Sequence, residues 1–135
     1  MFSQIQPGLV GELEIIVAAE HTALHLGSGN VAVLATPQMI RWMEGASVHA
    51  VDPLLPPGYS TVGVHLDVRH LSATPVGMKV RALARLVAVD GRKLTFLVSA
   101  SDDRELIGEG THQRVIVELS RFKQRVEAKL EPPLR

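Results

Sequence analysis

One helix-like segment stands among segments with strand periodicity, and this order limits the possible folds more than any other feature of the chain. Residues 36–51 read TPQMIRWMEGASVHAV, and at about 100° per residue Met39, Met43 and Ala46 fall on one arc. Thr36 is a residue type that caps helix starts, and the proline that follows it suits a first turn. The segment therefore predicts an amphipathic helix with one packed face.

Most of the remaining chain predicts strands, because apolar and polar residues alternate along much of it. The predicted strands cover residues 9–19, 59–71, 78–89, 93–101 and 105–119. The Asp90-Gly91 pair is a hairpin signal between two of them. A short C-terminal helix capped by Ser120 is predicted over residues 121–130. Residues 20–35 contain glycine-rich turn chemistry and predict a lid-like segment with a short strand or helical turn.

One helix cannot cover both faces of such a sheet, so the natural packing wraps an antiparallel sheet around the helix in an α+β fold. The 135 residues suit a single domain, residues 1–135, with a real core. The face away from the helix still carries apolar strand positions at Leu83, Val87 and Val89. A second copy of the chain would cover exposed apolar positions, so the sequence predicts a homodimer and leaves a higher oligomer open.

The composition excludes several classes of protein. Lys plus Arg and Asp plus Glu both number 14, so the formal net charge is zero and gives no bulk attraction to nucleic acid or membranes. The absence of cysteine excludes disulfides, thiolate metal sites and a cysteine nucleophile. Neither a secretory leader nor a membrane-spanning stretch is recognised, so a cytoplasmic protein is predicted.

Glu44 breaks the pattern of the predicted helix. It lies at the shoulder of the apolar arc, on a row with Thr36, Ile40 and Val48. A carboxylate there is partly desolvated, which is costly unless the group is paired or used in chemistry. The pattern alone leaves two interpretations open: Glu44 bends out to water or pairs with an arginine, or it serves as an acid–base group.

His70 breaks the pattern of the strand predicted at 59–71. By simple alternation it shares the helix-facing side with four apolar residues, Val62, Val64, Leu66 and Val68. Glu44 and His70 should then lie close together and could form an acid–base or orienting pair. A core histidine satisfied by backbone groups is the other interpretation.

The other histidines give no clear site. His49 and His65 lie at polar positions and are expected to be solvated. His21 and His25 are four residues apart and could bind a metal if that segment were helical, but no third ligand is suggested. No metal site is predicted.

A set of spaced residues carries a resemblance to a known family. The set is Thr36, Glu44 and His70, then Ala73-Thr74-Pro75-Val76-Gly77 and, late in the chain, Gly110-Thr111-His112-Gln113-Arg114. In this joint spacing the chain resembles the hotdog-fold thioesterases, and among them the fluoroacetyl-CoA thioesterase type. No GxSxG elbow, P-loop or GxGxxG occurs, so α/β-hydrolase, nucleoside-triphosphatase and Rossmann interpretations lose support.

The resemblance implies a hotdog dimer that cleaves acyl-CoA thioesters at the subunit interface, with no cofactor beyond the CoA of the substrate. It implies catalytic roles for Thr36, Glu44 and His70. Substrate-binding positions are implied at Gly63, Val64, His112 and Arg114. Glu44 could attack the thioester carbonyl or activate water, and His70 could orient Glu44 or protonate the departing thiolate. Thr36 could hydrogen-bond the acyl oxygen, and an amide near Gly63 could stabilise an oxyanion.

The sequence says less about which acyl group is cleaved and about where the nucleotide end of CoA binds. The fluoroacetyl-specific enzyme carries phenylalanines in its lid, whereas GSGNVAVLAT at residues 27–36 has none. The resemblance therefore implies thioester cleavage but not fluoroacetyl selectivity. The low aromatic count and the small lid residues suggest a short or polar acyl group. No phosphate-binding loop is visible, so surface cations should hold the nucleotide, with Arg69, Lys79, Arg81 and Arg114 as candidates.

Two other functions remain on the same fold. One is a non-catalytic module that binds acyl-CoA or another small ligand. The other is a hydratase. Hydratases of this fold usually have an Asp/His pair on a differently placed motif, which this chain lacks. Thr36, Glu44 and His70 together favour hydrolysis, because binding alone does not need an acid–base group.

Overall fold

The computed structural model describes residues 2–133 and contains one five-stranded antiparallel sheet. The strands are β1 (Val10–Ile16), β2 (Tyr59–His70), β3 (Lys79–Asp90), β4 (Lys93–Asp102) and β5 (Leu106–Glu118). Their order across the sheet is β1-β3-β4-β5-β2, so β1 and β2 form the two edges. The four later strands match their predicted positions to within one residue at either end.

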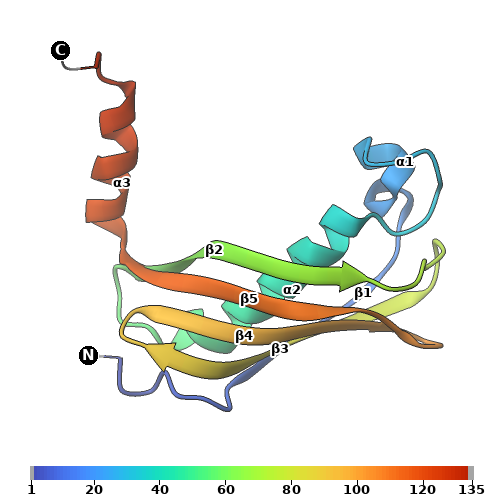
Figure 1. Ribbon diagram of the computed structural model, residues 1–135, viewed down its shortest axis with the longest axis horizontal. Helices are drawn as coiled ribbons and strands as arrows, with labels where there is room; N and C mark the ends of the chain where they lie inside the picture. Colours follow the sequence, from blue (N-terminus) through green and yellow to red (C-terminus); the bar gives the residue numbers. More distant parts are fainter. Residues whose placement is uncertain (1, 134–135) are drawn as a thin grey trace.

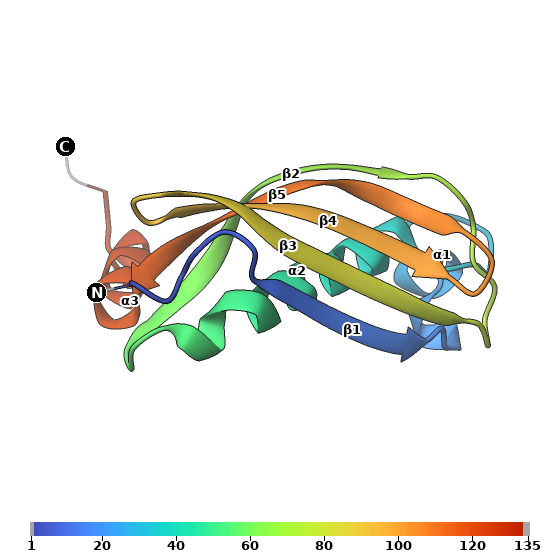
Figure 2. The same ribbon diagram turned by 90° about the horizontal axis from the view of Figure 1, so that it is seen from below.

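The helix α2 (Thr36–Val51) has the predicted boundaries and lies along one face of the sheet, as Figure 2 shows from below. Met39, Met43 and Ala46 are fully buried and form the core with β3 and β4. All four predicted inward residues of β4 are buried as well: Leu94, Phe96, Val98 and Ala100. The predicted α+β arrangement of a sheet curved around one helix is confirmed.

The remaining elements are short. They are η1 (Ala19–His21), α1 (Ala23–Leu26), η2 (Asp52–Leu54), α3 (Leu119–Glu127) and η3 (Ala128–Leu130). The predicted lid-like segment contains η1 and α1. Single β-bridges connect Thr22 to Leu34 within it and Val33 to Pro75 outside it. β1 ends three residues earlier than predicted because residues 17–21 turn into η1.

The C-terminal helix α3 stands away from the sheet beside the free edge of β2 (Figure 1). It begins at Leu119, so the predicted start at residue 121 and the predicted cap at Ser120 are wrong. The Ser120 hydroxyl instead donates to the Glu118 carboxylate, and no side chain caps the helix.

A β-bulge changes the direction of side chains in the middle of β2. The pairing with β5 shifts between Gly63 and His65, so Val64 is the extra residue. Before the bulge Thr61, which lies opposite buried Ile116, points toward α2; after it, His70 does. The predicted inward positions of Val62 and Val64 are therefore wrong, and Val64 is 54% exposed. The inward directions of Leu66, Val68 and His70 follow from the register and are confirmed.

The face of the sheet away from α2 carries no helix within residues 2–133 (Figure 2). Val87, the extra residue of a bulge in β3, is exposed and Leu83 is half-buried, as the sequence indicated. Past this bulge Val89 pairs with buried Leu94, so it lies on the side of α2, and its predicted position on the outer face is wrong. No helix in this part of the chain is both long and apolar enough to cross a bilayer.

β1 and α2 approach each other closely at Gly11. A methyl group added there would collide with the backbone of Ala46 and Ala50. Only glycine allows this approach, because the obstructing atoms belong to the helix backbone and cannot rotate away.

We therefore expect Gly11→Ala to lower the free energy of unfolding by about 1–3 kcal/mol or more, because α2 must move off the sheet. Gly29→Ala is a matched control, since its added methyl would make an ordinary contact of 3.4 Å with Ala23. Urea unfolding of both variants measures the difference, and equal stability of the two would contradict the close packing described here.

Candidate active site

Thr36 and His70 form one part of the site. The Thr36 hydroxyl oxygen lies 2.7 Å from His70 Nδ1. Thr36 was expected to cap α2, but the N-cap is Ala35, which has no capping group, and Thr36 is the first helical residue. Its hydroxyl is therefore available to a histidine 34 positions along the chain. The helix start and the end of β2 are joined by this bond.

The second nitrogen of this histidine has no partner. His70 Nε2 is buried without a hydrogen bond among the described residues. Burial lowers the pKa of His70, and the backbone of Ser72 opposes this shift in part. A cavity of about 400 Å³ lies beside Thr36 and His70, between the lid and the start of the β2–β3 connection. No aromatic residue is among the lid residues that line it, which are Ala23, Ser28, Gly29, Asn30, Val31, Val33 and Leu34.

Glu44 and Arg114 form the second part of the site. Glu44 Oε2 lies 3.8 Å from Arg114 Nη1, and the Glu44 side chain is 39% exposed. Of the interpretations left open by the sequence, pairing with an arginine is thus observed, although the separation exceeds that of a direct charge-assisted hydrogen bond. The carboxylate retains free acceptor positions and access to solvent.

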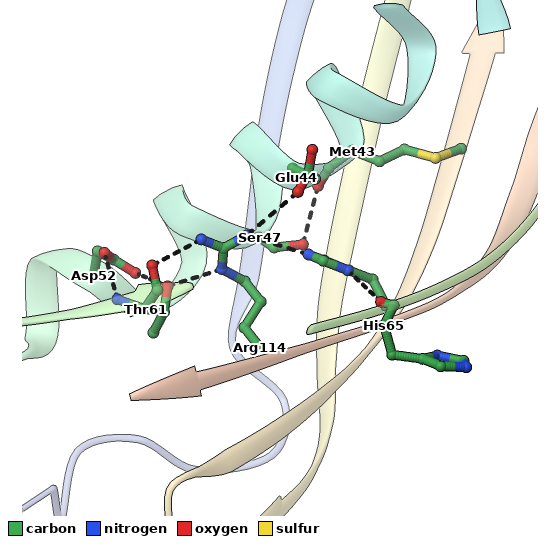
Figure 3. Close-up of polar contacts among 8 residues, drawn as sticks. Met43, Glu44, Ser47, Asp52, Thr61, His65 and Arg114 are labelled. Atoms are coloured by element: carbon green, nitrogen blue, oxygen red, sulfur yellow. Dashed lines mark hydrogen bonds and ion pairs between the residues drawn. The ribbon is translucent and has the colours of Figure 1, made fainter. Parts of the chain in front are cut away.

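Arg114 is buried and held by several acceptors. Its Nε donates to Thr61 Oγ1 at 2.8 Å and its Nη2 to the Thr61 carbonyl at 2.9 Å. Figure 3 shows the guanidinium between Thr61 and Asp52 on one side and Glu44 on the other. Burial lowers the pKa of Arg114, whereas the negative charges of Asp52 and Glu44 raise it. An arginine remains protonated throughout the physiological range, so a fixed positive charge faces Glu44.

His112 is fully buried beside this guanidinium, and its neighbours fix its proton. Nδ1 lies 2.8 Å from the His65 carbonyl oxygen, and Nε2 lies 3.2 Å from Arg114 Nη1. A carbonyl only accepts and a guanidinium only donates, so His112 is neutral with its hydrogen on Nδ1. Burial is the main cause that lowers the pKa of His112, and the charge of Arg114 lowers it further.

Gly63 provides open backbone at the same place. A methyl group at Gly63 would lie 3.0 Å from Glu44 Oε2, 3.2 Å from His112 and 3.4 Å from Arg114 Nη1. The bulge at Val64 leaves backbone groups there outside the regular ladder with β5. The exposed backbone of Gly63 therefore lies close to the Glu44 carboxylate, to His112 and to Arg114.

These contacts form two clusters within one chain: Thr36 with His70, and Glu44 with Gly63, His112 and Arg114. The eight residues from Thr36 to Glu44 span about 12 Å of helix. No hydrogen bond joins Glu44 to His70 in the described part of the chain, so the expected direct pair is not formed.

The remaining candidates lie apart from these clusters. Arg69 pairs with Glu109 at 3.2 Å, Arg81 with Glu12 at 2.9 Å, and Lys79 with Glu14 at 4.0 Å, all at the surface. His21 Nδ1 accepts from the Ala18 amide and its ring packs edge-on against Trp42. No group of three or more His, Asp or Glu side chains in residues 2–133 is arranged to hold a metal.

Comparison with known proteins shows the family of this chain. A sequence model of the fluoroacetyl-CoA-specific thioesterase family matches residues 17–120. The fluoroacetyl-CoA thioesterase of Streptantibioticus cattleyicolor is 42% identical over 97 residues, which cover 72% of this chain and 70% of that protein. The chain belongs to the fluoroacetyl-CoA-specific thioesterase family.

Solved structures extend the likeness to the whole fold. A solved structure of the fluoroacetyl-CoA thioesterase FlK superimposes with a TM-score of 0.86 at 34% identity, over 96% of this chain and 98% of that one. A hot-dog-like protein from Thermanaerovibrio acidaminovorans gives 0.89 at 20% identity over 97% of each chain, which shows the fold alone. The predicted hotdog fold and the assignment as a thioester hydrolase are confirmed.

The pKa shifts of this thioesterase-family chain predict a pH dependence of stability. His70 and His112 have lowered pKa values in the fold, so the unfolded chain binds more protons below about 6.5, the ordinary pKa of histidine. The free energy of unfolding should therefore fall as the pH is lowered from 7 to 5, by up to about 1.4 kcal/mol per unit for each histidine.

Denaturant unfolding at several pH values measures this slope. His112→Gln should flatten it, whereas His49→Gln, at an exposed histidine, should not. A slope that is unchanged in His112→Gln would show that His112 is not held neutral by its surroundings.

Proposed function

We propose that this chain hydrolyses short-chain acyl-CoA thioesters with Thr36, Glu44 and His70. The observation that carries the proposal is the 2.7 Å contact between Thr36 and His70 beside the cavity under the lid, with Nε2 of the histidine left without a partner. A hydroxyl–imidazole pair at a cavity is suited to bind an acyl oxygen and to transfer a proton. A structural histidine would use both nitrogens.

The chemistry needs an attacking oxygen, an oxyanion site and a proton for the leaving group. Glu44 either attacks the thioester carbon and forms an anhydride that water then cleaves, or deprotonates a water molecule that attacks directly. In both routes the carbon–sulfur bond breaks and the thiolate takes a proton, which His70 supplies through Nε2. The Thr36 hydroxyl donates its one hydrogen to His70 Nδ1, which keeps the His70 hydrogen on Nε2. The backbone near Gly63 stabilises the developing negative charge on the carbonyl oxygen.

A homodimer brings the two clusters to one place. β2 is an edge strand, so a second β2 can pair with it in the antiparallel direction around a two-fold axis. With the axis near Leu66 and Asp67, the partner's His70 lies opposite Gly63 and hence near Glu44. The complete site would then take Glu44, Gly63 and Arg114 from one copy and Thr36 and His70 from the other.

Exposed apolar side chains along this edge support the dimer. Val64 is 54% exposed, Leu66 39% and Leu71 47%, although all three lie in or next to β2. An uncovered apolar edge strand favours pairing with another strand. The lid adds Leu24, Leu26 and Val31, which are also exposed.

The acyl group is proposed to be short, because small and polar lid residues line the cavity beside Thr36. Fluoroacetyl-CoA is the substrate named for the relative from Streptantibioticus cattleyicolor. Phenylalanine is absent from residues 20–35 of this chain, so other short acyl groups are equally good candidates. The cytoplasmic location, the absence of a cofactor and the surface site for the nucleotide stay predictions.

Near-isosteric substitutions test the catalytic assignment. Glu44→Gln and His70→Asn should each lower kcat by about 100-fold or more, which corresponds to about 3 kcal/mol of barrier. Thr36→Val should cost less if it only donates a hydrogen bond. The effects should be far from additive, because residues that act as one unit fail together. Thiol release from a panel of short acyl-CoAs, followed with a thiol reagent, measures them.

Substitution of the exposed His49 by glutamine is the control and should leave kcat unchanged. Wild-type turnover in Glu44→Gln at an unchanged melting temperature would refute the mechanism. If no acyl-CoA is hydrolysed but one is bound, the non-catalytic binding module becomes the better account.

The dimer predicts a mass in solution of twice the chain mass of 14.6 kDa. Sedimentation equilibrium at micromolar concentration measures it directly. Val64→Asp would place a charge on the pairing edge and should shift the protein toward monomer with loss of activity. A monomeric wild-type protein with full activity would exclude the composite site.

A further inference from the structure

Asp52, at the C-terminal end of α2, accepts three hydrogen bonds from the start of β2. Its donors are Ser60 Oγ at 2.7 Å, Thr61 Oγ1 at 2.7 Å and the Thr61 amide at 3.3 Å. A carboxylate is disfavoured at a helix C-terminus, where the helix dipole is negative. Hydrogen bonds from β2 must therefore offset the free-energy cost of the charged Asp52 carboxylate at this position.

Thr61 connects this carboxylate to the guanidinium of Arg114. The Thr61 hydroxyl donates to Asp52 and accepts from Arg114 Nε at 2.8 Å, so its single hydrogen and one lone pair are both used. The Thr61 carbonyl accepts from Nη2 at 2.9 Å. Because the guanidinium is planar, fixing two of its nitrogens directs the third, Nη1, toward Glu44 and His112.

The charged groups are arranged in the same order, from Asp52 through Arg114 to Glu44. Arg114 is 7% exposed and lies between two carboxylates, Asp52 and Glu44. Glu44 stays 3.8 Å from Nη1, longer than the 2.7–2.9 Å of a direct charge-assisted bond. Arg114 thus meets its hydrogen-bonding requirement at Thr61, and Glu44 is not drawn into a tight ion pair.

We propose that Asp52 is a positioning residue: acting through the Thr61 hydroxyl, it holds the Arg114 guanidinium so that Nη1 faces the Glu44 carboxylate and the open backbone at Gly63. The inference rests on the proposed function, in which Glu44 and Gly63 meet the thioester. Without Asp52, the Thr61 hydroxyl loses its acceptor and can turn its hydrogen toward Arg114, which frees the guanidinium to close on Glu44. The carboxylate would then be engaged before the substrate arrives.

The neighbouring hydroxyl supplies a matched control. Ser60 donates to Oδ2 of the same carboxylate and makes no bond to Arg114, whereas Thr61 donates to Oδ1 and contacts both groups. We compare Asp52→Asn, Thr61→Val, Thr61→Ser and Ser60→Ala by steady-state kinetics, by melting temperature and by the NMR signal of the Arg114 Nε–H. That hydrogen is buried and bonded, so it should exchange slowly with water.

Asp52→Asn and Thr61→Val should lower kcat by about tenfold to hundredfold, with a smaller change in KM, because the substrate still binds but Glu44 is misplaced. Both should weaken or abolish the protected Nε–H signal. Thr61→Ser, which keeps the hydroxyl, should preserve kcat and the signal. Ser60→Ala should lose stability but also preserve both.

Loss of stability in Asp52→Asn and Thr61→Val with unchanged kcat would overturn the proposal, whether or not the Nε–H signal is lost. An equal loss of kcat in Ser60→Ala would overturn it as well. If the wild-type protein hydrolyses no thioester, the proposed function fails, and the Nε–H signal alone then decides whether Asp52 holds Arg114 in place.

Discussion

The packing of one helix against one face of the sheet is the constraint on which the other features depend. α2 can lie close to β1 only because residue 11 is glycine, and its apolar arc fills the space under β3 and β4. Its position then fixes two candidate site residues along its length. The first turn presents Thr36 to the end of β2, and the turns beyond present Glu44 to the middle of β2 and β5.

The elements of the fold were predictable because each has a clear local period. The boundaries of α2 follow from its apolar arc and its proline, and β4 follows from strict alternation. The direction of side chains in β2 was not predictable by the same rule, since a bulge shifts the period at Val64. A glycine inside a strand is a known sign of a bulge, so Gly63 was the available signal.

The sequence identified candidate site residues but not how the structure groups them. Glu44 and His70 both break the pattern of their own element, which is why they could be identified. Whether they touch depends on the angle between α2 and β2, which no local pattern contains. Asp52 and Thr61 were missed because the simple alternation that turns Val62 inward turns Thr61 outward. An Asp-Pro pair after a helix is also a usual sign that the helix ends. A carboxylate at a helix C-terminus was the signal that could have indicated a partner.

The central claim is that two copies of the chain share each active site, one supplying Glu44 and the other Thr36 and His70. Mixing Glu44→Gln with His70→Asn, both inactive alone, tests it most directly. After subunit exchange, half of the dimers should be mixed and each should contain one intact site, so activity should return to about a quarter of the wild-type value. If both clusters served the same site from a single chain, no mixed dimer would contain an intact site, and a mixture that stays inactive after proven exchange would contradict the account.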